Sequence, residues 1–355
     1  MRVSFLVVSA CLSVSLLTMP SARAAAQGGG ATLDWMVKAF GDGRHNAFTD
    51  LVQWRGAYYV CFRNGQSHGS MDGTIRVLRS ADLKHWEPCG TLDTFGDDRD
   101  PHFAVKDDTL FVYFGVWDLR HDPGHGTPGR GAVRSHVATT RDGTTWAAVQ
   151  GVYEPGWWLW RVEVHDGLFY SAAYQAFRPK PAHRELRLLR SVDGVAWEFV
   201  STIANEGDLG ESAMWFPEDG GIAMITRSGR APGHAVFSRS TPGLDAWNLT
   251  PLNTLVHSPA TVVWRGRRFV AGRGQRDGEW VTRLWEYADG ALVEGMTLPS
   301  AGDTSYPGLL VDPASEKEDA PALFISWYSQ HDDEREPGSP VDPASIYVGR
   351  VVVTP

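Results

Sequence analysis

Short runs of β-branched and aromatic residues come in pairs along this chain, and a two-residue turn separates the members of most pairs. Residues 48–54 and 58–63, for example, flank the turn Arg55-Gly56. Most of the other turns are Asp-Gly or Arg-Gly pairs, and Asp-Gly between β-rich runs is among the strongest short signals for a hairpin. The first runs of the six pairs begin at Phe48, Asp100, Trp160, Glu211, Ala260 and Tyr306. No amphipathic helix of normal length interrupts these runs, so the pattern predicts an all-β fold.

A second pattern, written Ser/Thr-x-Asp-Gly-x-x-Trp, follows an apolar strand at several places. It occupies residues 191–197 and 140–146 and recurs at 80–86 with Leu83 in the glycine position. A degenerate copy lies within 234–247. The hydroxyl and the carboxylate of such a turn accept hydrogen bonds from backbone amides, and the tryptophan packs back onto the sheet edge. The copies recur roughly every 50 to 60 residues, which is close to the period of propeller and solenoid repeats.

Four strands per repeat and six repeats predict a six-bladed β-propeller, with five blades as the alternative. The last strand, residues 345–352, would close the ring by pairing with an N-terminal segment near residues 32–40. Such closure leaves no long unpaired sheet edge. Because the repeat pattern continues across the Pro/Gly-rich stretch 122–131, we expect one β-propeller domain over residues 31–355.

Residues 1–24 have the features of a secretory signal peptide. Arg2 supplies the positive charge, residues 3–17 the apolar run, and Ala22-Arg23-Ala24 the small-x-small cleavage site. The run is too short for a membrane-spanning helix with these flanks, so a secreted or periplasmic protein is expected. The mature chain keeps Cys61 and Cys89, which could pair in an exported protein or serve as unpaired packing residues.

The composition narrows the class of partner. The 355 residues carry a formal net charge of −9, and 43% of them are hydrophobic, which is ample for a large core. The acidity and the lack of a basic stripe argue against a nucleic-acid partner. Fifteen Trp and ten Tyr are many, and both β-strands and carbohydrate-facing surfaces use such residues.

In a propeller the first strand of each blade lines the central channel, so polar residues at one end of these strands converge. The charged and polar residues at these places are Asp50, Asp100, Arg161, Glu211 and Tyr306. The second runs end on Arg63, Arg227 and Arg273, in what the sequence predicts to be one position of their hairpins. Three converging guanidiniums make an anion site, because each offers a planar fork of donors to a carboxylate. Pairing of each arginine with a local Asp or Glu is the alternative.

Six blades, these turns and these polar residues together resemble the sialidase (neuraminidase) superfamily with its Asp-box turns, over nearly all of the mature chain. The resemblance implies an arginine triad of Arg63, Arg227 and Arg273, a nucleophile Tyr306, and Glu211 as its partner. It also implies an acid/base in the loop 64–73, where His68 lies nearest the expected place and Asp72 is the only carboxylate. The turns are one residue shorter than usual and, like Arg99-Asp100-Pro101, also resemble those of five-bladed arabinan- and fructan-cleaving enzymes.

This resemblance implies a retaining hydrolysis of sialic acid or a related acidic sugar on a glycoconjugate. A neutral phenol avoids the repulsion that a carboxylate nucleophile would meet at an anomeric carbon bearing a carboxylate. Phenol needs a base to take its proton, and Glu211 would do so for Tyr306. No metal or organic cofactor is required, and no ligand-spaced loop demands a structural Ca²⁺.

Two other functions remain open at this stage. One is a glycosidase of another sugar that uses Asp100 and Glu211 as a carboxylate pair across the channel. The other is a non-catalytic propeller that binds acidic sugars. The first would tolerate loss of the Tyr306 hydroxyl, and the second would bind ligand without turnover.

Overall fold

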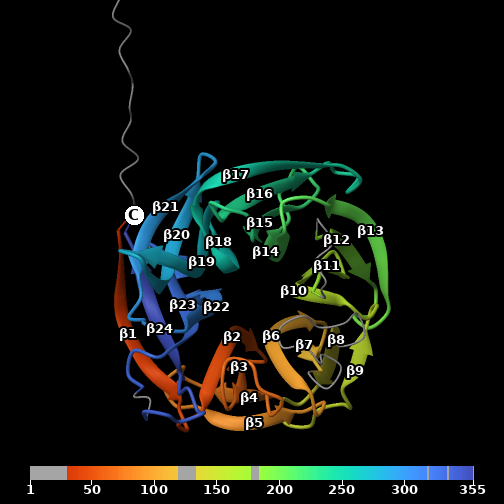
Figure 1. Ribbon diagram of the computed structural model, residues 1–355. Helices are drawn as coiled ribbons and strands as arrows, with labels where there is room; N and C mark the ends of the chain where they lie inside the picture. The colour runs from red at the N-terminus through yellow and green to blue at the C-terminus, as the bar shows by residue number, and fades with distance from the viewer. Residues whose placement is uncertain (1–29, 119–132, 177–183, 318–319, 334–335, 355) are drawn as a thin grey trace, which may run out of the picture.

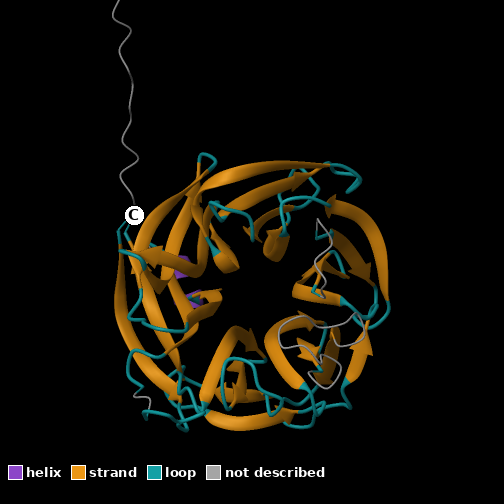
Figure 2. Ribbon diagram, viewed as in Figure 1, coloured by secondary structure: helices purple, strands orange, loops and turns teal. Residues whose placement is uncertain are grey.

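The computed structural model of the protein describes residues 30–118, 133–176, 184–317, 320–333 and 336–354. The signal peptide predicted for residues 1–24 and the stretch 122–131 lie outside these ranges. Within them the chain forms β-strands β1–β24 and a short 3₁₀ helix, Pro313–Lys317, and no α-helix (Figure 2). The strands make six four-stranded sheets arranged around a central axis (Figure 1). The six-bladed propeller is confirmed, and the five-bladed alternative is wrong.

Each blade is an antiparallel meander whose first strand is innermost. Blade I contains β2 (His45–Trp54), β3 (Ala57–Gly65), β4 (Thr74–Ser80) and β5 (Glu87–Leu92). Blade II contains β6 (Asp97–Lys106), β7 (Thr109–Trp117), β8 (Val133–Thr140) and β9 (Gln150–Val152). Blade III contains β10 (Trp157–His165), β11 (Leu168–Gln175), β12 (Leu186–Ser191) and β13 (Trp197–Ala204). Blade IV contains β14 (Leu209–Trp215), β15 (Ala223–Ser228), β16 (His234–Ser240) and β17 (Trp247–Leu255). Blade V contains β18 (His257–Trp264), β19 (Arg267–Arg276), β20 (Glu279–Ala288) and β21 (Ala291–Thr297).

Blade VI joins the two ends of the chain. It contains β22 (Thr304–Val311), β23 (Ala322–Ser329), β24 (Ser345–Val353) and β1 (Ala31–Phe40). β1 pairs antiparallel with β24 from Ala31 opposite Val353 to Phe40 opposite Ile346. The predicted ring closure is therefore confirmed, and each blade packs its sheet on the next instead of leaving a long open edge.

The Ser/Thr-x-Asp turns connect the third and fourth strands of blades I to III and hold the hydrogen bonds that the sequence predicts. In the copy of blade III, Asp193 Oδ1 accepts from the backbone amides of Val195 and Ala196 at 2.8 Å, and Ser191 Oγ accepts from Gly194 at 2.9 Å. Gly194 has φ +80. The Tyr113 hydroxyl of blade II donates to its carbonyl at 2.8 Å, so this turn also fastens one blade to its neighbour.

The core lies between the blades, where large aromatic side chains are buried from both sides. Trp160, Trp285 and Trp327 are among the largest fully buried side chains. Cys61 is buried and Cys89 half-buried, and both are free thiols, so they are unpaired packing residues instead of a disulfide. Of the described residues, none belongs to a helix long and apolar enough to cross a membrane.

All six innermost strands carry a β-bulge near their N-terminal end. Two residues on the first strand oppose one on the second; the pairs are 48–49, 100–101, 160–161, 210–211, 258–259 and 306–307. The first bulge residue has positive φ at Phe48, Asp100, Ser258 and Tyr306. A bulge bends its strand and changes the direction of a side chain. Three bulge residues, Asp100, Glu211 and Tyr306, form the candidate site.

Candidate active site

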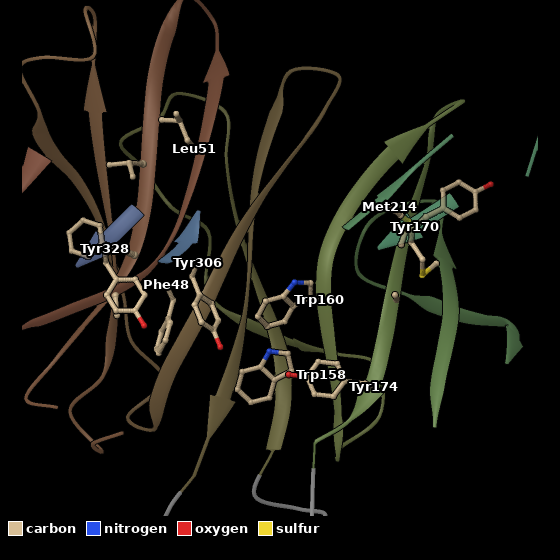
Figure 3. Close-up of a cluster of buried hydrophobic side chains, with 14 of the residues drawn as sticks. Phe48, Leu51, Trp158, Trp160, Tyr170, Tyr174, Met214, Tyr306 and Tyr328 are labelled. Atoms are coloured by element: carbon tan, nitrogen blue, oxygen red, sulfur yellow. The ribbon is translucent and has the colours of Figure 1, made fainter. Parts of the chain in front are cut away.

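A cavity of about 410 Å³ opens where the bulges of blades II, IV and VI meet, and it has a mixed polar and aromatic lining. Its acidic residues are Asp100, Asp208 and Glu211, and its arginines are Arg99, Arg184 and Arg227. Its aromatic residues are Trp117, Trp158, Tyr174 and Tyr306. Figure 3 shows the Tyr306 ring between Phe48 and Trp160, whose ring centroids lie 4.8 and 6.0 Å away. This packing fixes the ring, and the hydroxyl points toward the side where Trp158 and Tyr174 lie.

Tyr306 and Glu211 form a hydrogen-bonded pair, although 95 residues separate them in the chain. The Tyr306 hydroxyl donates to Glu211 Oε1 at 2.9 Å, and Arg227 Nη1 donates to the same oxygen at 2.7 Å. The second oxygen, Oε2, accepts from the backbone amide of Ser258 at 2.7 Å. Both side chains of the pair are buried. The predicted pair is therefore assembled, with the carboxylate held by three different blades.

The surroundings of this pair shift the pKa values of its two members in opposite directions. Burial, followed by the negative charge of Glu211, raises the pKa of Tyr306. Burial opposes ionisation of Glu211 as well, but Arg227, His257 and the hydrogen bond from Tyr306 outweigh it and lower the pKa of Glu211. At neutral pH the pair is thus a neutral phenol beside a carboxylate. This is the arrangement in which a carboxylate accepts a proton from an otherwise weak nucleophile.

The three predicted triad arginines do not share one hairpin position. Arg63 and Arg273 stand opposite the residue just before the bulge, whereas Arg227 stands opposite the bulge itself. Arg227 lines the cavity with a side chain 32% exposed. Arg273 lies behind Tyr306, its guanidinium 5.5 Å from the ring centroid, and its Nη1 is 3.3 Å from Asp303 Oδ1.

Arg63 differs from the prediction because its guanidinium is fully buried away from the cavity. Its Nε donates to Asp97 Oδ1 at 2.6 Å, its Nη1 to the Ser67 carbonyl at 2.8 Å, and its Nη2 to Ser70 Oγ at 3.0 Å. These bonds occupy every nitrogen of the guanidinium. Arg63 therefore holds the loop that follows β3 in place, and Arg99 takes its place in the cavity lining.

Asp50 and Arg161, predicted to bind substrate, are instead bonded to each other across the channel. Arg161 Nη1 donates to Asp50 Oδ1 at 2.7 Å, its Nε to the Pro259 carbonyl at 3.0 Å, and its Nη2 to the Pro307 carbonyl. Asp50 Oδ2 accepts from the backbone amide of Phe103 at 2.8 Å. Neither side chain lines the cavity. This cross-channel ion pair joins blades I, II, III, V and VI.

The two predicted acid/base residues, His68 and Asp72, both lie outside the cavity lining. His68 is half exposed, and its Nδ1 is 2.5 Å from Asp303 Oδ2. Asp72 pairs with Arg44 at the surface and accepts from the backbone amide of Gln66. Asp100, by contrast, lines the cavity together with Glu211 and Tyr306.

His45, His68 and Asp303 form the one cluster among the described residues that could hold a metal ion. His45 Nε2 lies 3.0 Å and His68 Nδ1 2.5 Å from the same atom, Asp303 Oδ2. Arg273 contacts the other carboxylate oxygen, and Arg99 Nη2 is 3.4 Å from His68 Nε2. The guanidiniums of Arg273 and Arg99 would repel a cation. If His45 bound a metal through Nε2, its Nδ1 would carry a proton, and Nδ1 has no hydrogen-bond acceptor. The cluster fits a hydrogen-bonded network better than a metal site.

Several cavity residues were not singled out as site residues from the sequence. They are Arg99, Trp117, Trp158, Tyr174, Arg184 and Asp208. A usable signal existed in Pro101, Pro259 and Pro307, since proline inside a strand run is typical of a bulge or an edge. The neighbours of those prolines would have pointed to the re-aimed side chains Asp100 and Tyr306.

Known proteins resemble this one in fold but not closely in sequence. A scan against protein-family models finds no match, and a search of curated proteins finds none either. Among solved structures, the Trypanosoma rangeli sialidase in complex with the inhibitor DANA superposes with a TM-score of 0.64 at 13% identity. That match covers 91% of this chain and 60% of the sialidase, so this chain spans about three fifths of its length.

Two other solved structures match over similar spans. The phage phi92 endosialidase gives a TM-score of 0.62 at 12% identity, covering 92% of this chain and 70% of that one. An α-L-arabinanase from Penicillium chrysogenum, complexed with arabinobiose, gives 0.61 at 14%, covering 89% of this chain and 98% of that one. At such identities the likeness is one of architecture. The chain has the sialidase-like six-bladed β-propeller fold.

Proposed function

We propose that this protein is a retaining glycoside hydrolase that releases sialic acid or a related acidic sugar, with Tyr306 as nucleophile and Glu211 as its base. The observation that supports this most is the 2.9 Å hydrogen bond from the Tyr306 hydroxyl to Glu211 Oε1. It lies in a cavity large enough for a sugar ring and flanked by arginines. The hydrolases among the similar folds agree with this class of reaction.

In the first half-reaction, Glu211 takes the proton of the Tyr306 hydroxyl as the phenolic oxygen attacks the anomeric carbon. The bond from that carbon to the glycosidic oxygen breaks, and the leaving oxygen receives a proton from a general acid. In the second half-reaction, water attacks the same carbon and loses a proton to that group. The bond to Tyr306 breaks, and Glu211 returns the proton to the phenolic oxygen.

The charges around Tyr306 support an acidic substrate. Arg227 and Arg273 both oppose the rise in the pKa of Tyr306, and Arg99 reaches the same cavity from blade II. Arg227 has one carboxylate partner and an exposed face, so its planar fork can bind a carboxylate bidentately. A fixed guanidinium can orient such a substrate without rearranging during the reaction.

A second candidate is a glycosidase of a neutral sugar that works with the carboxylates of Asp100 and Glu211. It is favoured by one observation, that both carboxylates line the same cavity while Arg227 is partly neutralised by Glu211. In that enzyme the Tyr306 hydroxyl would only position Glu211. The two candidates therefore differ in what removal of that hydroxyl does.

The test compares turnover of an aryl α-sialoside with that of aryl β-galactoside and aryl α-L-arabinofuranoside. Tyr306→Phe keeps the ring and its packing, and we expect it to lower kcat on the sialoside by roughly a thousandfold or more, because no covalent intermediate can form. Glu211→Gln should lower kcat by roughly a hundredfold or more, because an amide cannot accept the phenol proton. In the wild type, trapping with a 2,3-difluorosialic acid should displace the fluoride from the anomeric carbon and add the remaining monofluorinated sugar, the reagent mass less HF, to the peptide containing Tyr306.

Full activity of Tyr306→Phe on a neutral aryl glycoside would favour the carboxylate-pair enzyme instead. Binding of sialic acid without turnover of any of the three substrates would favour a sugar-binding protein. Urea unfolding of both variants shows whether a loss of activity comes from the site or from the fold.

A further inference from the structure

One carboxyl group in the cavity lining, that of Asp100, has an oxygen without any hydrogen-bond partner. Asp100 is the first residue of the bulge on β6, with φ +51, and is 8% exposed. Its Oδ1 is buried and has no hydrogen-bond partner, and its Oδ2 is 3.7 Å from Arg99 Nε. A buried carboxylate oxygen without a partner is costly if it is ionised. The arrangement suits a protonated carboxyl group that faces the cavity.

The other acidic groups near the cavity have partners already. Glu211 accepts from Tyr306, Arg227 and Ser258. Asp208 Oδ1 lies 3.2 Å from Arg184 Nε. His68 and Asp72, which the sequence suggested, lie outside the lining and contact Asp303 and Arg44.

We propose that Asp100 is the general acid and base of the reaction, an inference that rests on the proposed function of this site. As the phenolic oxygen of Tyr306 bonds to the anomeric carbon, the Asp100 carboxyl donates its proton to the departing glycosidic oxygen. Asp100 is then a carboxylate, and it takes a proton from the water that attacks the anomeric carbon. That step restores its proton while the bond to Tyr306 breaks and Glu211 reprotonates the phenol. Atoms and protons balance over the cycle without a further reactant.

The acidity of Asp100 agrees with this role. Burial raises the pKa of Asp100 to about 7, with Arg99 opposing the rise and Glu211 adding to it. The charged and titratable groups that act on it are Arg99 and Asp97 on its own strand, Arg63 on β3, Tyr174 on β11, Glu211 on β14 and Tyr306 on β22. Two carboxylates of one site whose environments push their pKa values apart are the mark of an acid and a base with separate tasks.

The backbone at Asp100 decides which substitutions can test the role. Asn adopts a left-handed conformation readily, whereas Ala at φ +51 would strain the bulge. Asp100→Asn therefore removes the acid with little change of shape. Asp100→Gly also tolerates this φ and leaves room for a small anion such as azide. His68→Ala serves as the comparison for the acid that the sequence suggested.

The experiment measures kcat/KM of these proteins on 4-methylumbelliferyl α-sialoside, whose leaving group hardly needs a proton, and on methyl α-sialoside, which needs one. For Asp100→Asn we expect a loss of about 10²–10⁴-fold on the methyl sialoside and of less than about tenfold on the aryl sialoside. Azide should accelerate Asp100→Gly on the aryl sialoside. His68→Ala should change both substrates by the same factor.

The pH dependence gives a second readout. The acid must be protonated, so wild-type kcat/KM on methyl α-sialoside should fall as the pH rises through about 7. Asp100→Asn should lose this alkaline limb.

Equal losses on both sialosides in Asp100→Asn, with Tyr306 still labelled by the difluoro sugar, would overturn the role of Asp100 and leave the proposed function standing. A loss confined to methyl α-sialoside in His68→Ala would assign the acid to His68. If the wild type hydrolyses neither sialoside, the proposed function fails, and the role of Asp100 fails with it.

Discussion

Two sets of ionisable residues lie along the central channel, each on the first strands of different blades: one set on β6, β14 and β22, the other on β2 and β10. The cavity set consists of Asp100, Glu211 and Tyr306, and the cross-channel ion pair consists of Asp50 and Arg161. Both sets are buried and both come from the pocket end of the first strands. They differ in their partners: Asp50 and Arg161 bond to groups of the protein, whereas Asp100 lines the cavity with a buried Oδ1 that has no hydrogen-bond partner, and the Arg227 side chain stays partly exposed there.

This difference separates a structural charge from a functional one better than burial or charge alone. A buried ion pair whose donors and acceptors are all satisfied inside the protein has nothing left to offer a ligand. A buried polar atom without a partner keeps its hydrogen-bonding capacity for a substrate, at a cost to the folded state. Under the proposed function, the cavity set gives up some stability for binding and chemistry, whereas the ion pair has a structural role alone.

The largest effect is expected at the ion pair. Arg161→Met should lower the free energy of unfolding by about 3–5 kcal/mol, because Asp50 would be left as an unpaired buried charge. The double variant with Asp50→Asn should recover part of this loss, since no charge then remains. Asp100→Asn should change the free energy of unfolding by less than about 1 kcal/mol, because Asp100 Oδ1 loses no partner. Urea unfolding measures all three, and an Arg161→Met protein as stable as wild type would break the comparison.

The fold could be predicted because its signals are local. Each Ser/Thr-x-Asp turn needs only the residues of one turn, and Gly194 and its equivalents stand where φ is positive. Leu83, with φ 64, shows that the turn forms even where the sequence lacks the glycine. Pairing of β1 with β24 is a long-range contact, but a propeller must close somewhere, so the chain ends were the only strands left to do it.

The site could be predicted only in part, because one extra residue changes the side of a strand that a side chain faces. Tyr306 and Glu211, which the resemblance implies as partners, are hydrogen-bonded, and each lies in the bulge of its own strand. The bulges shift Arg227 by one position relative to Arg63 and Arg273, and a count along the sequence cannot show this shift. Which arginine reaches the cavity then depends on partners such as Asp97, which come from the neighbouring blade.

A smaller effect should separate Arg227 from Arg63. Arg227→Lys keeps the charge but loses the planar fork, and we expect the Kd for N-acetylneuraminic acid to rise roughly tenfold. Arg63→Lys should leave that Kd unchanged but lower the free energy of unfolding by about 1–3 kcal/mol, because buried acceptors on Asp97 and Ser67 lose a donor. Isothermal titration calorimetry and urea unfolding separate the two. A higher Kd for Arg63→Lys at unchanged stability would return Arg63 to the binding site.

The smallest effect is expected at Asp72, the only carboxylate in the loop where the sequence placed the acid. Although some burial opposes it, hydrogen bonds from Ser70, Gln66 and Arg44 lower the pKa of Asp72, so the group is ionised at neutral pH and has no proton to donate. The side chains of Arg44 and Asp72 are 41% and 46% exposed, and ion pairs in contact with solvent contribute little because water and salt screen them. Asp72→Asn should therefore change the free energy of unfolding by at most about 1 kcal/mol.

The same variant should leave the ratio of kcat/KM between aryl and methyl α-sialosides as it is in the wild type. Arg44→Gln is the matched control, because it removes the same surface ion pair from the other side without touching a carboxylate. If Asp72→Asn alone lost activity on the methyl sialoside only, a proton donor would lie in the loop after all. The buried Asp100 Oδ1 without a partner would then lower the free energy of unfolding without contributing to catalysis. The difference in partners between the cavity set and the ion pair would then not separate functional from structural residues.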